Sequence, residues 1–412
     1  MAFDYTAAGN ILKEVYLPAL QELLNNATPL LSQLEKEVTP VEGGNFVIAL
    51  HTGRNAAAAI ARAEGGTLPT AGEQSYKRAI VPVKQLYSRI EVSGKAIAAT
   101  RSNKGAFLKA LEGEMKYVMI DTKRQLNRQL NGDGTGALAY WTGADDSSGT
   151  NVDDGLGNGT TYLPSGATTL DLVDASDHTT ILGTNLVVTR GTVGSTSTAI
   201  TWTGTVSGSA TGDYLVWPGT ASKEMVGIRA VISDSNPPTL TGGLHGLTVA
   251  ANPDWRAFIL GSDSAKQELS FPLIQQLLSR IGSESGADES DIKMFYGHPA
   301  MRDTYVTLCQ DERVFYNVMK LDGGWEAVTY NGKPLVADVQ ARRNALFAIT
   351  PSSMSLMQMA PLDFMDKDGS MFYRISGGDK DAYGATAFVY QELGCKARNQ
   401  NGALVGINEV WV

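Results

Sequence analysis

Histidine and cysteine are the first side chains to consider as zinc ligands, catalytic bases or nucleophiles. No two of them have the spacing that brings two metal ligands together on one helix or turn, and the two cysteines are 86 positions apart. A zinc site is therefore not expected, and two cysteines are too few for a disulfide framework. The residues concerned are His51, His178, His245, His298, Cys309 and Cys395.

Carboxylates cluster at one place, in the stretch DDSSGTNVDDG over residues 145–155. Clustered carboxylates beside a glycine suit a calcium ion. The stretch departs from the EF-hand pattern because Asp153 is followed two positions later by Gly155, so a solvated acidic loop is the favoured interpretation. A glycosidase would need two carboxyl groups about 5 to 9 Å apart, and the sequence singles out no such pair.

The signature motifs of common enzymes are absent from the sequence, which has no G-x-S-x-G elbow, no P-loop and no H-E-x-x-H. Gly132, Gly134 and Gly136 follow a predicted helix instead of preceding one, which is the wrong order for a dinucleotide-binding turn. A flexible exit from that helix is expected instead. His298 stands before Pro299 and is interpreted as a helix-start residue rather than a base. We therefore expect a protein that is not an enzyme, with no catalytic residue, cofactor or metal.

The composition describes a protein with a large core and a surface poor in charge. The chain has 412 residues, 43% of them hydrophobic, which suffices for two or more domains. Charged residues make up 19% of the chain, against about 25% in typical soluble proteins. Glycine occurs 44 times, above its usual share of about 7%. Low charge and high glycine fit extended segments and surfaces that partners cover.

The net charge of −9 is unevenly distributed, because residues 145–222 hold eight aspartates and one arginine and carry −7 of it. No basic patch for sequence-specific nucleic-acid binding is present. No run of about 18 apolar residues could span a membrane. The N-terminus lacks the basic start and apolar run of a signal peptide, so a soluble protein made in the cytoplasm is expected.

The N-terminal part of the sequence predicts pieces that cannot form a core by themselves. Residues 1–45 hold short amphipathic stretches interrupted by prolines. Residues 46–51 and 86–92 have the pattern of strands. About thirty residues between them are poor in large apolar groups, and a loop of this length inside a compact domain is uncommon. We expect a long two-stranded arm, which is marginal in water unless another chain receives it.

A single long helix is predicted from residue 103 to residue 131, where apolar residues recur every three to four positions. It should be about 40 Å long and should end at Asn131 and Gly132 in a left-handed cap. Residues 133–222 are dominated by Ser, Thr, Gly and Asp, and they predict a small β-sandwich or barrel inserted into the chain. The strand-like runs are TTLDLV, NLVVTR, TAITWTG and DYLVW.

The C-terminal part predicts two helices followed by a β-rich return. Pro272 and Pro299 each open an apolar-periodic helix. Asn331 and Gly332 form a strong hairpin signal, and KDGS over residues 367–370 is a further turn. The order of these elements indicates an α+β protein.

Several phrases of the sequence, taken with this order of elements, are similar to one known family. The phrases are GGNFVIALHTGRN, VPVKQLYSRIEVSGKAI, RQLNGDGTG, YNGKPLVADVQARRNALFAIT and DAYGATAFVYQELGCKARNQNGALVGI. They resemble the major capsid proteins of tailed bacteriophages, which have the Hong Kong 97-type capsid fold. The resemblance covers most of the chain and leaves out about residues 145–222.

The resemblance implies an α+β capsid fold with an N-terminal arm, an extended β-hairpin loop, a long spine helix, peripheral and axial domains, and a small all-β insertion. The expected ranges are 1–50 for the arm, 51–93 for the extended loop (E-loop), 94–144 and 356–398 for the peripheral domain with its spine helix, 145–222 for the insertion, and 223–355 and 399–412 for the axial domain. The extended loop would lie over a neighbouring subunit. Its expected inter-subunit residues are Arg54, Gly65, Gly66, Lys77 and Arg78, with the two glycines at the tip.

The function that the resemblance implies is self-assembly into the icosahedral head that encloses the double-stranded DNA genome of a tailed phage. The partners would be other copies of the chain in pentamers and hexamers, a separate scaffolding protein, a portal and a decoration protein. Packaged DNA would be contacted non-specifically, no membrane would be involved, and the chain would reside in the virion. Some members of the family crosslink a loop lysine to an asparagine, but no local pattern matches around Lys77 and Asn331, which are interpreted as ordinary surface residues.

Three other functions remain open at this stage. A cargo-holding bacterial nanocompartment has the same fold. A β-rich surface protein could bind carbohydrate through Trp202 or Trp217, although core packing of these tryptophans is favoured. A hydrolase with unrecognised residues is the weakest alternative.

Overall fold

The computed structural model of this chain describes twelve stretches and one isolated residue, Asp146. Residues 1–27 and 39–43 of the expected arm (1–50) and the KDGS turn at 367–370 lie outside them. The described stretches are 28–38, 44–55, 58–93, 104–143, 149–153, 162–194, 197–285, 289–312, 318–320, 326–366, 373–374 and 382–409.

The first described segment has no core of its own and lies on the rest of the chain. It contains α2 (Pro29–Gln33) and β1 (Glu35–Val38), and β1 pairs in parallel with β17. Leu30 is fully buried, and the Leu31 backbone N–H donates to Asn127 Oδ1 on the long helix at 3.3 Å. This part of the arm therefore depends on tertiary packing.

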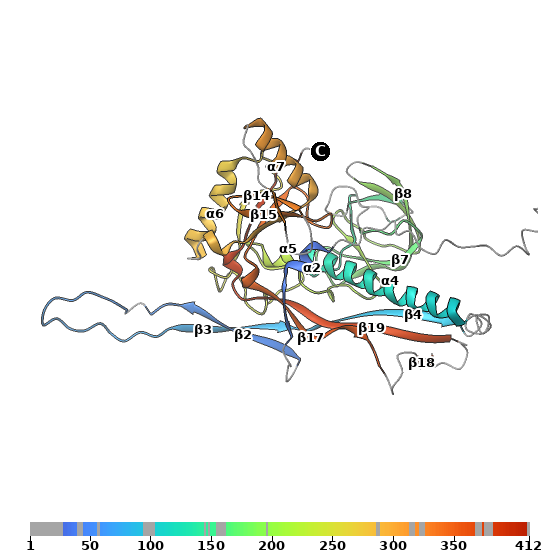
Figure 1. The fold of residues 1–412 in the computed structure, drawn as a ribbon, viewed down its shortest axis with the longest axis horizontal. Helices are drawn as coiled ribbons and strands as arrows, with labels where there is room; N and C mark the ends of the chain where they lie inside the picture. The colour runs from blue at the N-terminus through green and yellow to red at the C-terminus, as the bar shows by residue number, and fades with distance from the viewer. Residues whose placement is uncertain are drawn as a thin grey trace, which may run out of the picture.

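The long helix α4 runs from Lys104 to Asn131, as its periodicity predicts. It lies along a mixed sheet whose strands follow the order β1-β17-β19-β18, with β4 also paired to β19 (Figure 1). Small residues of β19 such as Ala385 and Ala387 are buried, and the hydroxyls of Ser88 on β4 and Thr122 on α4 bond at 2.7 Å. The strands are β4 (Lys84–Ser93), β17 (Met354–Phe364), β18 (Tyr373–Arg374) and β19 (Ala382–Cys395).

The return strand of the projecting hairpin differs from the prediction. β2 (Asn45–Gly53) pairs antiparallel with β3 (Ser75–Pro82), and the alternating segment 86–92 belongs to β4, which pairs with β19. The alternation of 86–92 was recognised correctly, but it marks a strand with one face turned toward α4. The expected pairing was wrong because the alternation of apolar and polar residues predicts which face of a strand is buried, but it does not predict which strand lies beside it.

The exit from α4 is a tight buried turn, not a flexible linker. Gly134 and Gly136 are buried and have φ angles of +88° and +85°, a region that favours glycine. Gly132 is not among the residues with positive φ, so the expected left-handed cap at Asn131 and Gly132 is not formed there. Asn131 instead bonds inward, because its Oδ1 accepts from the Tyr296 hydroxyl at 2.7 Å.

The inserted β-rich region forms a closed barrel of six strands in the order β10-β5-β6-β9-β8-β7. The four strand-like runs of the sequence are β7 to β10, while β5 begins at Ala139, before the boundary expected at residue 145. Trp141 and Trp202 fill the barrel core with their ring centroids 5.0 Å apart. The strands are β5 (Ala139–Trp141), β6 (Gly149–Asp153), β7 (Thr168–Val173), β8 (Ile181–Val193), β9 (Thr198–Thr203) and β10 (Tyr214–Val216).

The aspartates of the barrel hold its turns together. The buried carboxylate of Asp171 accepts the backbone N–H of Asn185 at 2.7 Å, and that of Asp213 accepts the N–H of Ala175 at 2.9 Å. The Asp146 carboxylate accepts from Ser209 and Gly208, and these bonds hold its pKa below the usual range. These three aspartates thus act as acceptors for backbone N–H groups that the loops leave unpaired.

The remaining residues form a seven-stranded sheet in the order β11-β20-β16-β12-β15-β14-β13 together with α6 and α7. His298 caps α7 as predicted, because its Nδ1 accepts the Ala300 N–H at 3.2 Å. The β14–β15 hairpin turns at Asn331 and Gly332, both with positive φ, as predicted. The elements are α5 (Ile228–Val231), β11 (Phe258–Gly261), α6 (Phe271–Ser285), β12 (Met294–Gly297), α7 (Pro299–Asp311), β13 (Val318–Lys320), β14 (Glu326–Tyr330), β15 (Lys333–Ala337), β16 (Ala345–Ile349) and β20 (Gly402–Val405), with short 3-10 turns at Glu289–Asp291, Pro351–Ser353 and Arg398–Gln400.

Glu392 on β19 is a buried acid with one unsatisfied oxygen. Its Oε1 accepts the backbone N–H groups of Val226 and Leu393 at 2.7 and 3.0 Å, whereas Oε2 has no hydrogen-bond partner among the described residues. Burial raises the pKa of this carboxyl to about 8. The native state therefore keeps the proton that the unfolded chain releases above about pH 4.5, and stability should fall as pH rises from there toward 8.

We expect Glu392→Gln to stabilise the protein at pH 8 by about 1 to 3 kcal/mol, because the amide keeps the Oε1 acceptor and removes the buried ionisable group. At pH 5 the gain should be much smaller. Urea unfolding at both pH values measures this. Glu409→Gln is the control, since the buried Glu409 carboxylate bonds Arg343 Nε at 2.9 Å and its loss should destabilise the protein at both pH values. A Glu392→Gln variant less stable than the wild type at pH 8 would contradict the prediction.

Candidate assembly surface

The β2–β3 hairpin has two different faces. Directly paired residues of an antiparallel ladder lie on the same face. One face carries Phe46 opposite Val81, and both are buried against Met357 of β17. The other face carries Val47 opposite Ile80, which remain 56% and 38% exposed. The base of the hairpin is therefore fixed to the body by one face while an apolar opposite face is left open.

Beyond the ladder, the hairpin continues as a long exposed loop that projects away from the body (Figure 1). The last pair of the ladder joins Gly53 to Ser75 after a register shift. Every residue from 58 to 78 except Pro69 is exposed, including Leu68 at 81%. An extended segment of this kind buries little apolar surface against its own chain, so we expect contact with a partner to stabilise its conformation.

The sequence-predicted loop residues are spread along this hairpin and are not brought together. Arg54 is exposed just beyond the ladder, and Arg78 is exposed opposite Ala49. Gly65 has a φ of +73° in a turn closed by the Gly66 N–H donating to Ala63 O, near the middle of the loop. Lys77 differs from the others, because its Nζ donates to Asn252 Oδ1 on the body of the same chain.

Sequence reasoning missed the apolar and aromatic part of this surface. His51 and Tyr76 are paired across the ladder with ring centroids 5.3 Å apart, and Tyr76 is 70% exposed. On the sheet, Tyr87 is 54% exposed and its hydroxyl lies 3.1 Å from that of Tyr390. The alternation of VIALH in β2 could have indicated an apolar open face. The pairing of Tyr87 with Tyr390 could not be read from sequence, because they are far apart along the chain.

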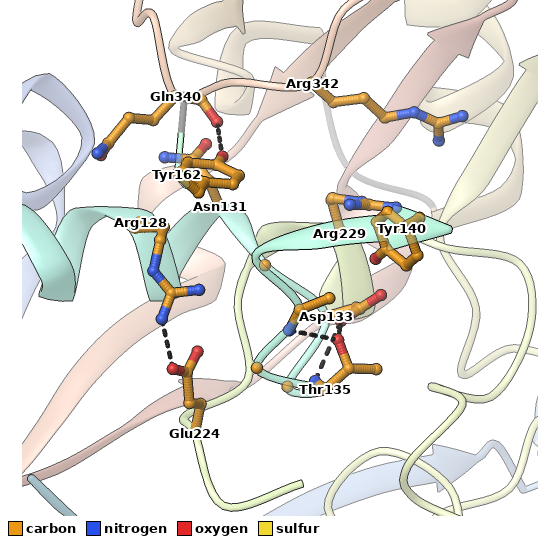
Figure 2. Close-up of a pocket in the computed structure, with 14 residues that line it drawn as sticks. Arg128, Asn131, Asp133, Thr135, Tyr140, Tyr162, Glu224, Arg229, Gln340 and Arg342 are labelled. Carbon is orange, nitrogen blue, oxygen red and sulfur yellow. Dashed lines mark hydrogen bonds and ion pairs between the residues drawn. The ribbon is translucent and has the colours of Figure 1, made fainter. Parts of the chain in front are cut away.

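The cavity at the end of α4 was tested as an alternative site (Figure 2). It lies where α4, the barrel and the loop after β15 meet. Arg128 forms an ion pair with Glu224, and Tyr162 from the barrel donates to Gln340 O at 2.6 Å. Its described lining contains no histidine, cysteine or lysine, and the Thr135 hydroxyl donates to Asp133 Oδ1 within the turn that leaves α4. This ion pair joins α4 to the segment that follows the barrel, as Figure 2 shows for Arg128 and Glu224.

Two further kinds of site are not supported among the described residues. No group of three or more His, Cys, Asp or Glu side chains could hold a metal ion in that part of the chain. No described helix is long and apolar enough to cross a membrane. Trp202 is only 7% exposed in the barrel core, and Trp217 packs partly buried against it, which contradicts a carbohydrate platform built on Trp202.

Comparison with known protein families and with curated proteins finds no match. Solved structures do match over nearly the whole length. The capsid asymmetric unit of cyanophage A-1(L) is 12% identical and has a TM-score of 0.59, with 98% of each chain covered. The capsid of a native GTA particle is 9% identical with a TM-score of 0.52 and 99% of each chain covered. An encapsulin complex from Synechococcus elongatus PCC 7942 is 10% identical with a TM-score of 0.47, covering 99% of this chain and 97% of the other.

The first two matches align this chain with phage and GTA capsid subunits from one end to the other, so the similarity extends to the arrangement of the whole chain. At this level of identity the likeness is one of fold. The hairpin, the long helix and the two sheets correspond to the elements that the sequence resemblance implied. The chain therefore has the α+β capsid fold of tailed bacteriophages, of the Hong Kong 97 type, with a small all-β barrel inserted into it.

Proposed function

We propose that this chain is the major capsid protein of a tailed bacteriophage. Copies assemble as pentamers and hexamers into an icosahedral head around a double-stranded DNA genome, and the chain has no enzymatic role. The observation that carries the proposal is the hairpin, whose residues 58–78 are exposed apart from Pro69 and project beyond the body. Structures of the same fold over nearly full length are capsid subunits, which supports a structural shell protein.

The proposed partners follow from this role. The open face of the hairpin, with Val47, Ile80 and Tyr76, would pack on a second copy of the chain. A separate scaffolding protein would guide assembly, a portal would occupy one vertex, and a decoration protein could bind outside. The genome would be contacted without sequence preference, and the mature chain would be located in the virion.

The test of this function is assembly of the purified chain. We expect sedimentation and negative-stain images to show capsomers, shells or irregular polymers as concentration rises, alone or with the scaffolding protein. A compact monomer at every concentration under both conditions would contradict the proposal. Particles isolated from the source should contain DNA. A protein cargo in place of DNA would identify the alternative of the same fold, a bacterial nanocompartment.

A further prediction concerns hydrogen exchange in the loop. Residues 58–74 should exchange their backbone hydrogens rapidly in unassembled subunits, because the ladder ends at Gly53 and Ser75. In particles the same residues should be protected by neighbouring copies. Exchange followed by mass spectrometry in both states measures the difference. The buried strand β16 serves as an internal control that should be protected in both. Equal protection of the loop in the two states would contradict an inter-subunit role.

A further inference from the structure

The free edge of β3 is held by a loop from a distant part of the chain. β3 pairs with β2 on one side to form a two-stranded sheet. On its other side the Ile80 N–H donates to His245 O at 2.9 Å, and Lys77 Nζ donates to Asn252 Oδ1. The segment containing His245 and Asn252 therefore contacts the hairpin at two points near its base.

His245 has an unusual conformation for a buried side chain. It is 3% exposed and has a φ of +55°, between Gly243 at +80° and Gly246 at +79°. A non-glycine residue in this region is uncommon, and histidine is one of the residue types that adopt it more often than most. The imidazole Nε2 accepts the backbone N–H of Cys395, at the end of β19, at 3.2 Å.

The geometry requires a neutral imidazole, with Nε2 unprotonated to accept this bond. Burial and the nearby Arg398 guanidinium lower the pKa of His245 to about 4. The Arg398 guanidinium donates to Val231 O at 2.7 Å and to Ala230 O at 3.0 Å. Both acceptors lie shortly before His245 in the chain. The short stretch from Cys395 to Arg398 thus fixes this segment at two places.

We propose that His245 is a positioning residue that sets the direction in which the β2–β3 hairpin projects. Its carbonyl holds the edge of β3 at Ile80, and its side chain connects that edge to the end of β19 at Cys395. The two bonds run from one residue to two segments that lie far apart in the sequence. Backbone contact alone would not need a histidine, whereas the bond to Cys395 does need the ring nitrogen.

The direction of the hairpin matters for assembly because the hairpin is long. This consequence for assembly rests on the proposed shell function. From Ile80 to Gly65 the chain spans fifteen positions, or about 50 Å when extended. A rotation of about 10° at the base would then move the tip by roughly 9 Å, enough to miss its place on a neighbouring subunit. A fixed base keeps the reach of the loop reproducible from copy to copy.

The experiment measures the distance from the hairpin to the body in unassembled subunits. Spin labels are placed through Leu68→Cys on the loop and Gln276→Cys on α6, both exposed positions, and the native cysteines are both buried. His245→Phe should broaden the distance distribution about twofold. It should also speed exchange of the Cys395 amide about tenfold, the size expected for the one hydrogen bond that the phenyl ring cannot accept. His245→Gln keeps an acceptor at the position of Nε2 and should restore both values.

The matched control is His298→Phe. His298 is also a buried histidine, and it also accepts a backbone N–H through a ring nitrogen at 3.2 Å, but it does so at the start of α7. This variant should lose comparable stability and leave the hairpin distance unchanged. A control that broadened the distribution as much as His245→Phe would show a general loss of order and overturn the proposal.

A second variant acts from the other side of the same contact. Ile80→Pro removes the N–H that donates to His245 O, and that N–H faces away from β2. It should broaden the distance distribution even if His245→Phe fails to fold. Unchanged distributions in Ile80→Pro, or no recovery in His245→Gln, would overturn the proposal. Because these subunits are measured below the assembly concentration, failure to form shells would contradict the proposed function without altering this result.

Discussion

Replacing residues 54–74 by Asn-Gly is expected to weaken assembly strongly while leaving the subunit folded. Gly53 and Ser75 are directly paired across the ladder, so a two-residue turn can connect them without disturbing β2 or β3. The removed segment is almost entirely exposed, so its loss should change the melting temperature by only a few degrees. The concentration needed for assembly should rise at least about tenfold, since an interface contact worth 1.4 kcal/mol changes association by that factor. Sedimentation and negative-stain imaging measure assembly, and calorimetry measures folding.

A control variant with a loop of the same length separates the contribution of the loop side chains from that of the loop length. In that control residues 54–74 are replaced by a Gly/Ser segment of equal length, which keeps the reach but removes side chains such as Leu68 and Arg54. We expect it to fold like the wild type and to assemble poorly. Normal shells from the shortened variant would show that the hairpin loop has no part in assembly.

The second large effect is expected from removing the barrel. The Ser222 N–H donates to Thr135 O at 3.1 Å, so the chain enters and leaves the barrel at adjacent points. Replacement of residues 136–221 by a short Gly/Ser linker should therefore give soluble subunits that still form particles. We propose that the barrel lies on the outer face of the shell, and images should show particles of normal size without a knob of outer density.

The reason for the outer position is charge. Residues 145–222 carry −7, and the remainder of the chain carries little net charge. Like charges repel strongly only within about a Debye length, roughly 8 Å at physiological salt. Facing these aspartates toward packaged DNA would place them within that range. The nearly neutral remainder is better suited to face the genome. Among the described aspartates of the barrel, Asp171 and Asp213 are buried, whereas Asp146 and Asp177 are exposed.

The barrel also contacts the body, so a control for that contact is needed. Tyr162→Phe removes the bond from the Tyr162 hydroxyl to Gln340 O and keeps the barrel in place. It should cost about 1 kcal/mol, as one hydrogen bond does, and should leave the outer density intact. Insoluble subunits after barrel removal, or density lost from the inner wall, would contradict the proposed position.

The sequence by itself determined the elements whose signals are local. The periodicity of apolar residues predicted a helix that runs from Lys104 to Asn131 in the structure. Turn chemistry predicted the hairpin at Asn331 and Gly332, and His298 was recognised as a helix-start residue. Each of these depends on side chains a few positions apart, because capping, periodicity and turn conformation are set within a few residues.

Only the tertiary structure decided which distant segments meet. The pattern of residues 86–92 predicted a strand, but its partner β19 lies nearly three hundred positions later. The barrel takes in β5 at Ala139, a strand too short to be recognised before its partners are known. His245 connects Ile80 to Cys395 through two hydrogen bonds, and no pattern of neighbouring residues in the sequence predicts either of them. Strand pairing and buried contacts depend on the closure of long loops and on the packing of a shared core. The residues on either side of a strand in the sequence determine neither of these.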